Sequence, residues 1–416
     1  MGIKFKKDIQ YYKFCLYGFL KNLKFFEPFL ILFFIEKGLS FLQIGTIYAA
    51  GEITKYIFEI PTGIIADAVS RRRTMILAFI FYIISFIIYF FSTQYLFFFI
   101  AVIIFSFGEG FRTGTHKAMI FEYLQLKGWN DQKVHYYGHT RSWSQMGSAL
   151  SSLIAASIVF FSGSYKFIFI YSTIPYLLDL LLMISYPKEL DGNLVKLEGR
   201  KISRNFKIVI KEFILSLKKK FILVGITNLS VYSGFYKAVK DYLQPVLKTF
   251  ALALPIFILL EDKQRSAIVI GIVYFIIYFL TSYASRKSGN TADKFKNINL
   301  PLNITLVVGF AMGILAGVFY NLQFTFLAIL FYLGIYLIEN LRNPMGVSYV
   351  SEMFDQDILA TALSAKSQAK TIAAAIIAPL LGYFADKHGI GNSLIIISLL
   401  LILTAPLYLL KKKHRA

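Results

Sequence analysis

The sequence predicts an all-α integral membrane protein with twelve transmembrane helices in two pseudo-symmetric six-helix halves. Hydrophobic residues make up 57% of the 416-residue chain and charged residues only 16%, whereas about a quarter of an average soluble domain is charged. Apolar runs of about 20 residues, the length a helix needs to cross a bilayer, recur from end to end. Lysine and arginine collect in short segments between these runs, as is typical of cytoplasmic loops.

The twelve helices follow from the apolar runs taken in order. The first half, 1–187, is predicted to span the membrane at 11–36, 41–65, 74–92, 95–125, 138–162 and 165–187. A basic cytoplasmic linker, 188–218, follows. The second half, 219–416, is predicted to span it at 219–248, 264–285, 300–320, 322–350, 360–384 and 391–410. The apolar segment 251–260 is too short to span, and we expect it at the extracellular surface.

The distribution of basic residues predicts the orientation in the cell membrane. Basic clusters before the first helix, in 188–220 and after the last helix all fall on one side if twelve helices alternate. Because basic loops stay in the cytoplasm, both termini are expected to be cytoplasmic in a multi-pass plasma-membrane protein. The net charge of +21 is therefore assigned to topology and to anionic membrane lipid, with no nucleic-acid partner. We expect a monomer.

An internal repeat links the two halves. The fourth predicted helix carries Glu109-Gly110-Phe111-Arg112, and the tenth carries Glu339-Asn340-Leu341-Arg342. The next helix of each half then begins with a cation followed by serine, Arg141 in the first half and Lys366 in the second. Features that recur six helices apart indicate that the second half duplicates the first.

The loop after the second predicted helix resembles the signature motif of the major facilitator superfamily, Gly-x-x-Ala-Asp-x-x-Gly-Arg-Lys. The matching residues are Gly63, Ala66, Asp67, Arg71 and Arg72, with Ser70 in place of the second glycine. A shorter copy, Gly289-x-x-Ala292-Asp293, follows the eighth helix, and the lead-in to Gly63 resembles bacterial efflux-type members. The resemblance implies alternating access between two parallel repeats and a cytoplasmic latch at this motif. The alternative is that the arginines only anchor topology.

Charged residues inside the predicted membrane helices are the candidate transport residues. Glu109 and Arg112 are three positions apart and share a helix face, which His116 is expected to continue. Charges near mid-bilayer are costly and usually mark function, so a substrate or proton could act through this pair. A fixed structural ion pair is the alternative, and the repeat at Glu339 and Arg342 fits it equally.

A second group of candidates lies on the first two predicted helices. Glu52, Lys55 and Glu59 form one stripe, which supplies titratable groups if it faces a cavity and interdomain contacts if it faces another helix. Asn22 and Glu27 lie on the first helix, with Glu27 nearer the outer mouth.

Together these features predict a secondary active transporter driven by a proton gradient. Our first expectation is an antiporter that exports a small amphipathic or drug-like molecule. One alternative is uptake or facilitated diffusion of a polar or anionic metabolite held by Arg112 and Arg342, and another is a membrane sensor or scaffold that transports nothing. The sequence has no phosphate-binding loop of the Gly-x-x-x-x-Gly-Lys-Ser/Thr type and no metal-ligand spacing, so we expect neither an enzyme nor a bound cofactor or metal.

Overall fold

The computed structural model describes residues 6–129, 133–191, 220–292, 298–353 and 356–410, and these ranges are helical with no strand. Within them, eight helical segments are long and apolar enough to cross a membrane. The last of these, Lys366–Leu407, covers two predicted spans. The predicted spans 11–36, 41–65 and 219–248 are also helical, but they are interrupted or carry several charges. The all-α membrane fold is thus confirmed.

The chain divides into two compact units. The first comprises Met1–Phe29, Thr54–Phe206 and Ile270–Phe275, and the second comprises Leu30–Ile53, Lys207–Val269 and Ile276–Ala416. The boundaries pass through two long helices, α3 (Phe41–Val69) and α12 (Asp262–Ala292). The predicted linker 188–218 lies almost entirely outside the described residues, so the division into 1–187, 188–218 and 219–416 stays a prediction.

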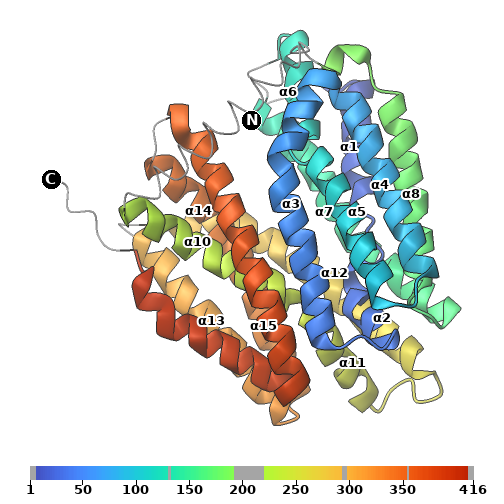
Figure 1. Ribbon diagram of the computed structural model, residues 1–416, viewed down its shortest axis with the longest axis vertical. Coiled ribbons are helices and arrows are strands. Elements are labelled where there is room, and N and C mark those ends of the chain that lie inside the picture. Colours follow the sequence, from blue (N-terminus) through green and yellow to red (C-terminus); the bar gives the residue numbers. More distant parts are fainter. Residues whose placement is uncertain (1–5, 130–132, 192–219, 293–297, 354–355, 411–416) are drawn as a thin grey trace. The chain divides into compact units, whose positions relative to one another are not determined.

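The first unit is a helix bundle in which α4 lies between α5 and α8, while α1 packs on α7 and α8 (Figure 1). Besides part of α3, its helices are α1 (Ile9–Lys21), α4 (Arg71–Phe91), α5 (Tyr95–Arg112), α6 (Thr115–Leu126), α7 (Lys133–Ser162) and α8 (Phe167–Ile184). A 3₁₀ turn, η3 (Lys188–Asp191), follows α8 and packs on α6 and α4.

The second unit repeats this packing pattern. Its helices are α2 (Leu30–Glu36), α10 (Lys220–Val239), α11 (Leu243–Ala253), α13 (Asn299–Asn321), α14 (Thr325–Met353) and α15 (Gln356–Thr404), with parts of α3 and α12. Here α10 packs on the first part of α15, as α1 packs on α7, and α13 packs on α14 and α15, as α4 packs on α5 and α8. The two sets of helices therefore carry the predicted internal repeat.

Two predicted helices are broken by single residues. The predicted helix 11–36 ends as α1 at Lys21 and resumes through a 3₁₀ turn, Glu27–Phe29, into α2. Pro28 lies in this turn and has no N–H for a helix that would continue through it. The predicted helix 95–125 breaks between α5 and α6, at Gly114. Hydropathy does not register such breaks, so the continuous helices we expected there were wrong.

Two other boundaries also differ. The predicted helices 360–384 and 391–410 form one element, α15, interrupted by non-helical backbone at Gly389 (φ 82°, ψ 164°). The predicted helix 219–248 ends as α10 at Val239 and continues through a 3₁₀ turn into α11. The first three residues of the segment 251–260 complete α11, and the rest forms turns and bends. Its position on the extracellular side stays a prediction.

Candidate functional site

The break between α5 and α6 positions the candidate site. Gly114 adopts φ 82°, and no heavy atom lies within 4 Å of the place where a Cβ would stand, so the left-handed conformation and not crowding favours glycine here. Hydroxyl groups on either side of the break bond back to carbonyls of α5. The hydroxyl of Thr113 donates to the Glu109 carbonyl at 2.7 Å, and that of Thr115 donates to the Phe111 carbonyl at 2.8 Å. The Thr113 N–H also donates to the Glu109 carbonyl, at 2.9 Å, so the hydroxyls reinforce the end of α5 at a depth where membrane lipid offers no hydrogen bonds.

Glu109 lies at the centre of a cluster of cations. Its Oε2 accepts a hydrogen bond from Arg112 Nη2 at 2.8 Å, and its Oε1 accepts one from the Tyr82 hydroxyl at 2.7 Å. Lys21 Nζ and Lys55 Nζ each lie 3.9 Å from a carboxylate oxygen of Glu109. The i,i+3 pair predicted from the sequence is therefore present, but three cations from α1, α3 and α5 share one carboxylate. Their positive charge exceeds what Glu109 neutralises.

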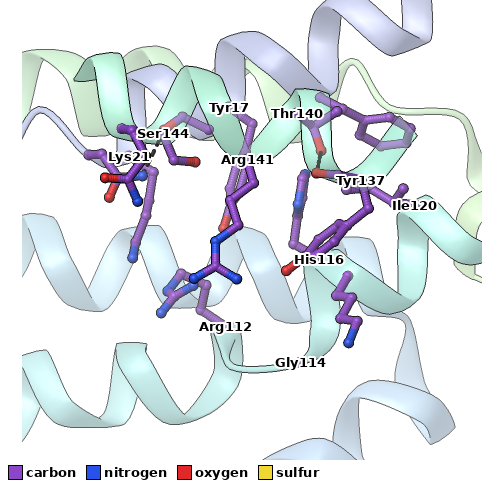
Figure 2. A pocket seen from close by; sticks show the side chains of 15 residues that line it. Tyr17, Lys21, Arg112, Gly114, His116, Ile120, Tyr137, Thr140, Arg141 and Ser144 are labelled. Atoms are coloured by element: carbon purple, nitrogen blue, oxygen red, sulfur yellow. Dashed lines mark hydrogen bonds between the residues drawn. The ribbon is translucent and has the colours of Figure 1, made fainter. Parts of the chain in front are cut away.

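A cavity of about 400 Å³ adjoins this cluster, within the first unit. We call it the cationic cavity. The lining residues are Phe14, Tyr17, Gly18, Lys21, Asn22, Arg112, Gly114, His116, Lys117, Ile120, Tyr137, Thr140, Arg141, Ser144 and Gln145. Figure 2 shows Arg112 and Arg141 reaching from different helices into the same space. None of these fifteen described residues is acidic, and the described chain has no cluster of His, Cys, Asp and Glu arranged to hold a metal ion.

Small residues let α1 and α7 approach closely beside the cationic cavity. A Cβ added at Gly147 would stand 2.4 Å from the Phe19 carbonyl oxygen, and one at Gly18 would stand 2.8 Å from the Ser144 hydroxyl. Because real Cβ atoms do not come this near to a backbone oxygen, the helices could not pack as they do with larger residues here. This approach sets the lining residues of α1 opposite those of α7.

His116 lines the same cavity as Arg112, but by a different route from the one predicted. The expectation that it continues the face of Glu109 and Arg112 on one helix was wrong, because the break at Gly114 starts a new helix. Its ring stacks on Tyr17 at 3.5 Å between centroids. Its Nε2 lies 3.2 Å from the hydroxyl of Tyr186.

The predicted gate motif braces the start of α4. Asp191 Oδ1 accepts hydrogen bonds from the Ser70 hydroxyl at 2.7 Å and from the Arg72 backbone N–H at 2.9 Å. Arg71 pairs with Glu122 on α6 at 3.2 Å, and Arg72 Nη1 donates to the Tyr186 carbonyl at 3.2 Å. The arginines therefore bridge neighbouring segments within the first unit, and their part in a latch stays a prediction.

The repeated pair of the second unit is built differently. Arg342 is 2% exposed, and its guanidinium donates to the Leu302 carbonyl, to the Thr305 hydroxyl at 2.8 Å and to the side-chain oxygen of Asn228 at 3.0 Å. Glu339 instead accepts from the Ser233 hydroxyl at 2.8 Å. The structure therefore does not form the ion pair expected from the i,i+3 spacing, because Arg342 has its donors committed elsewhere.

The remaining candidates do not line the cationic cavity, apart from Asn22 and Arg141, which do. Glu52 forms an ion pair with Lys237 on α10, within the second unit. Glu27 begins the short turn before α2. The side chains of Glu59 and Asp67, the surroundings of Gly63 and the whole of Asp293 lie outside what the structure describes.

Sequence reasoning missed three side chains that the structure makes prominent. Lys21 and Lys117 line the cationic cavity, and Asp179 is a fully buried carboxyl on α8. All three stand in predicted membrane helices, 11–36, 95–125 and 165–187, where a charge is a functional indication. That signal could have identified them.

Comparisons with known proteins agree on one family. The family model described as Major Facilitator Superfamily matches residues 15–367. A protein of Bacillus subtilis (strain 168), described as the uncharacterized MFS-type transporter YxaM, is 23% identical over 93% of this chain and 92% of its own length. A crystal structure of a mutant nucleoside transporter NupG superposes with a TM-score of 0.77 at 14% identity, over 96% of this chain and 98% of that one. A crystal structure of a D-xylose-proton symporter superposes with a TM-score of 0.64 at 18% identity, over 94% of this chain and 95% of that one. At these identities the likeness to solved structures shows the fold alone.

Proposed function

The chain belongs to the major facilitator superfamily of membrane transporters, and we propose that it carries a small anionic molecule, which binds in the cationic cavity of the first unit. The observation that carries the proposal is the charge of the cavity. Four of its lining residues, Lys21, Arg112, Lys117 and Arg141, are cationic, and no described lining residue is acidic. Concentrated charge of one sign in a low-dielectric wall attracts the opposite charge.

The side-chain chemistry suits a carboxylate or a phosphate. Arginine offers a planar set of donors that can hold such groups in a bidentate manner, and two arginines reach into the same space (Figure 2). Asn22, Thr140 and Gln145 add neutral polar groups to the lining. A volume of about 400 Å³ lies near the lower end of small-molecule sites, as suits a small metabolite.

An entering anion would compete with Glu109 for its cations. Lys21 Nζ lies 3.9 Å from Glu109 Oε1, too far for a hydrogen bond, so Lys21 can turn to a ligand at small cost. Arg112 is held more firmly, by bonds to Glu109 at 2.8 Å and 3.3 Å. Anion binding would thus change the contacts among α1, α3 and α5, and such a differential contact is what a ligand needs to shift a conformational equilibrium.

Export of an amphipathic or drug-like molecule, our first expectation from the sequence, finds less support in this cavity. Many such molecules are cationic or largely apolar, and a lining of four cations disfavours both classes. The anionic alternative drawn from the sequence is therefore the one that we propose. A proton gradient as the energy source is retained in the proposal.

Ligand-dependent thermal stability tests the proposal. Purified protein is heated with phosphate, sulfate, citrate, glycerol phosphate and neutral or cationic analogues at one ionic strength, because a ligand that binds the folded state raises the melting temperature. At least one anion should stabilise the parent protein, while the analogues should not. Arg141→Gln should lower the affinity for that anion by roughly tenfold to a hundredfold, the loss expected for one charge-assisted hydrogen bond.

The matched control is Lys127→Gln, which removes one positive charge from an exposed position outside the cavity. It should leave anion binding unchanged. The proposal is contradicted if neutral or cationic compounds stabilise the protein and anions do not. It is also contradicted if Arg141→Gln and Lys127→Gln lose equal affinity for the anion. A stabilising anion is then followed as a radiolabelled substrate in proteoliposomes.

A further inference from the structure

Asp179 on α8 is a buried acid that the proposed anion site does not use. Its residue is 0% exposed, and neither carboxyl oxygen has a hydrogen-bond partner among the described residues. Leucines flank it on both sides in the sequence Leu177-Leu178-Asp179-Leu180-Leu181-Leu182. An acid in such a place needs a reason, since a charged side chain inside a membrane helix is costly.

Three tyrosine hydroxyls, on α8, after α8 and on α4, are committed to other partners, whereas the hydroxyl of Tyr17 on α1 is buried without a hydrogen-bond partner among the described residues. Tyr176, on the same helix, donates to the Lys21 carbonyl at 3.2 Å. Tyr186, which follows α8, contacts His116 Nε2 and the Lys13 carbonyl. From α4, Tyr82 donates to Glu109. None of these three hydroxyls is hydrogen-bonded to the carboxyl.

The helices packed on α8 supply a single charged neighbour that acts on Asp179. These helices are α4, α1 and α7. Lys21 of α1 attracts the carboxylate electrostatically, and Tyr17 of α1 also lies within its electrostatic reach. On α4 the charged residues stand at its start, Arg71 to Arg73, and α7 has no acid or base from Ser142 to Ser162. Lys21 itself is turned to Glu109, at 3.9 Å.

These contacts decide which form of the carboxyl fits this conformation. An ionised carboxylate is a pure acceptor with about four lone-pair sites, and here none of them receives a donor from a described residue. Burying an unpaired charge is far more costly than burying the neutral acid. The neutral acid is therefore the form that the conformation accommodates.

We propose that Asp179 is a proton-binding site whose carboxyl is protonated in this conformation and, on releasing its proton to water, takes Lys21 as its counter-ion. The O–H bond at the carboxyl breaks, the proton leaves to solvent, and the Lys21 ammonium moves from Glu109 to the new carboxylate. Lys21 Nζ lies 3.9 Å from Glu109 Oε1, and its charge also acts on the Asp179 carboxyl.

This exchange connects the proton to the cationic cavity, because Lys21 and Tyr17 both line it (Figure 2). With Asp179 protonated, Lys21 is available to an anion; with Asp179 ionised, Lys21 is occupied. Proton and anion would therefore bind together, which favours transport of both in one direction. This last step rests on the proposed function, whereas the proton site itself does not.

Infrared difference spectroscopy tests the proton site with the proton as the only ligand. Protein in lipid bilayers is stepped from low to high pH, and the C=O stretch of a protonated buried carboxyl should disappear as the pH rises. Asp179→Asn should lack this band. The control Asp262→Asn makes the same change at an exposed carboxyl at the start of α12 and should keep it. If Asp179→Asn does not fold, Asp179→Glu should displace the band in frequency.

The role of Lys21 is tested in the same spectra. In Lys21→Met the ionised carboxyl loses its counter-ion, so the pH at which the band disappears should rise by about one unit or more. The assignment is overturned if the parent protein shows no such band, or if the band persists in Asp179→Asn. It is also overturned if the band keeps its frequency in Asp179→Glu, or if the pH midpoint does not move in Lys21→Met. These spectra need no transported molecule. A negative result in them therefore does not bear on the proposed anion binding, and a negative result in the anion screen does not bear on the proton site.

Discussion

Replacement of Glu109 by glutamine tests the cation cluster most directly. The change keeps the shape of the side chain but leaves Lys21, Lys55 and Arg112 without their shared counter-charge. Removing one partner of a buried ion pair costs about 3–5 kcal/mol. We expect a loss of about 3 kcal/mol, because the side chains of Lys55 and Arg112 are 27% and 20% exposed and exposure weakens such pairs.

The assay compares unfolding free energies of purified variants, with Glu122→Gln as the matched control. Among the described residues Glu122 pairs with one cation, Arg71 at 3.2 Å, and the pair is partly exposed, so its loss should cost about 1 kcal/mol or less. The same anion that stabilises the parent should stabilise Glu109→Gln more, because it replaces the missing negative charge. Equal stability of the two glutamine variants would refute the claim that Glu109 holds three cations together.

The double variant Glu109→Gln/Arg112→Gln separates structure from mechanism. Two cations instead of three are then left without a counter-charge, so we expect part of the lost stability to return. Gradient-driven transport should stay absent, because the substrate contact at Arg112 is gone. Recovery of transport near the parental rate, with normal pH dependence, would show that the pair is structural only.

Three further predictions concern packing, the gate motif and topology. Gly147→Val should destabilise the protein by about 1–3 kcal/mol, measured by thermal unfolding, because its Cβ would stand 2.4 Å from the Phe19 carbonyl oxygen; unchanged stability would contradict the close approach of α1 and α7. Asp67→Asn should insert normally and transport more slowly in proteoliposomes, and equal rates would leave the motif as a topology signal. Reporter fusions after Lys220 and at Ala416 should both report the cytoplasm, and an extracellular signal from either would contradict the twelve-helix topology.

The fold could be predicted from the sequence because its main determinant is local. A run of about 20 apolar residues suffices to indicate a membrane helix. The breaks inside helices could not be predicted in this way, because they depend on single residues that hardly change the mean hydropathy. Gly114 and Gly389 adopt positive φ, and nothing in the neighbouring composition distinguishes them from helical glycines such as Gly147.

The candidate site was predictable only as far as one helix turn. Glu109 and Arg112 could be paired from their spacing, but Lys21 and Lys55 join them from other helices, and contacts between distant segments leave no mark in a single sequence. The same limit explains the error at Glu339 and Arg342. Their spacing is identical, yet Thr305 and Asn228 from neighbouring helices take the donors of Arg342.

The contrast between these two arginines bears on how a duplicated transporter diversifies. Two of the four hydrogen bonds that Arg342 donates go to main-chain oxygens, those of Leu302 and Asn228, and the main chain does not change when a side chain is replaced. Arg112 is held by a carboxylate and a phenol, which a single codon change can remove. After duplication, one copy of the motif could thus hold neighbouring helices together, while the side chains around the other copy remained free to change under selection. New specificities in this lineage should therefore arise by substitutions around Arg112, with Arg342 and its surroundings left alone.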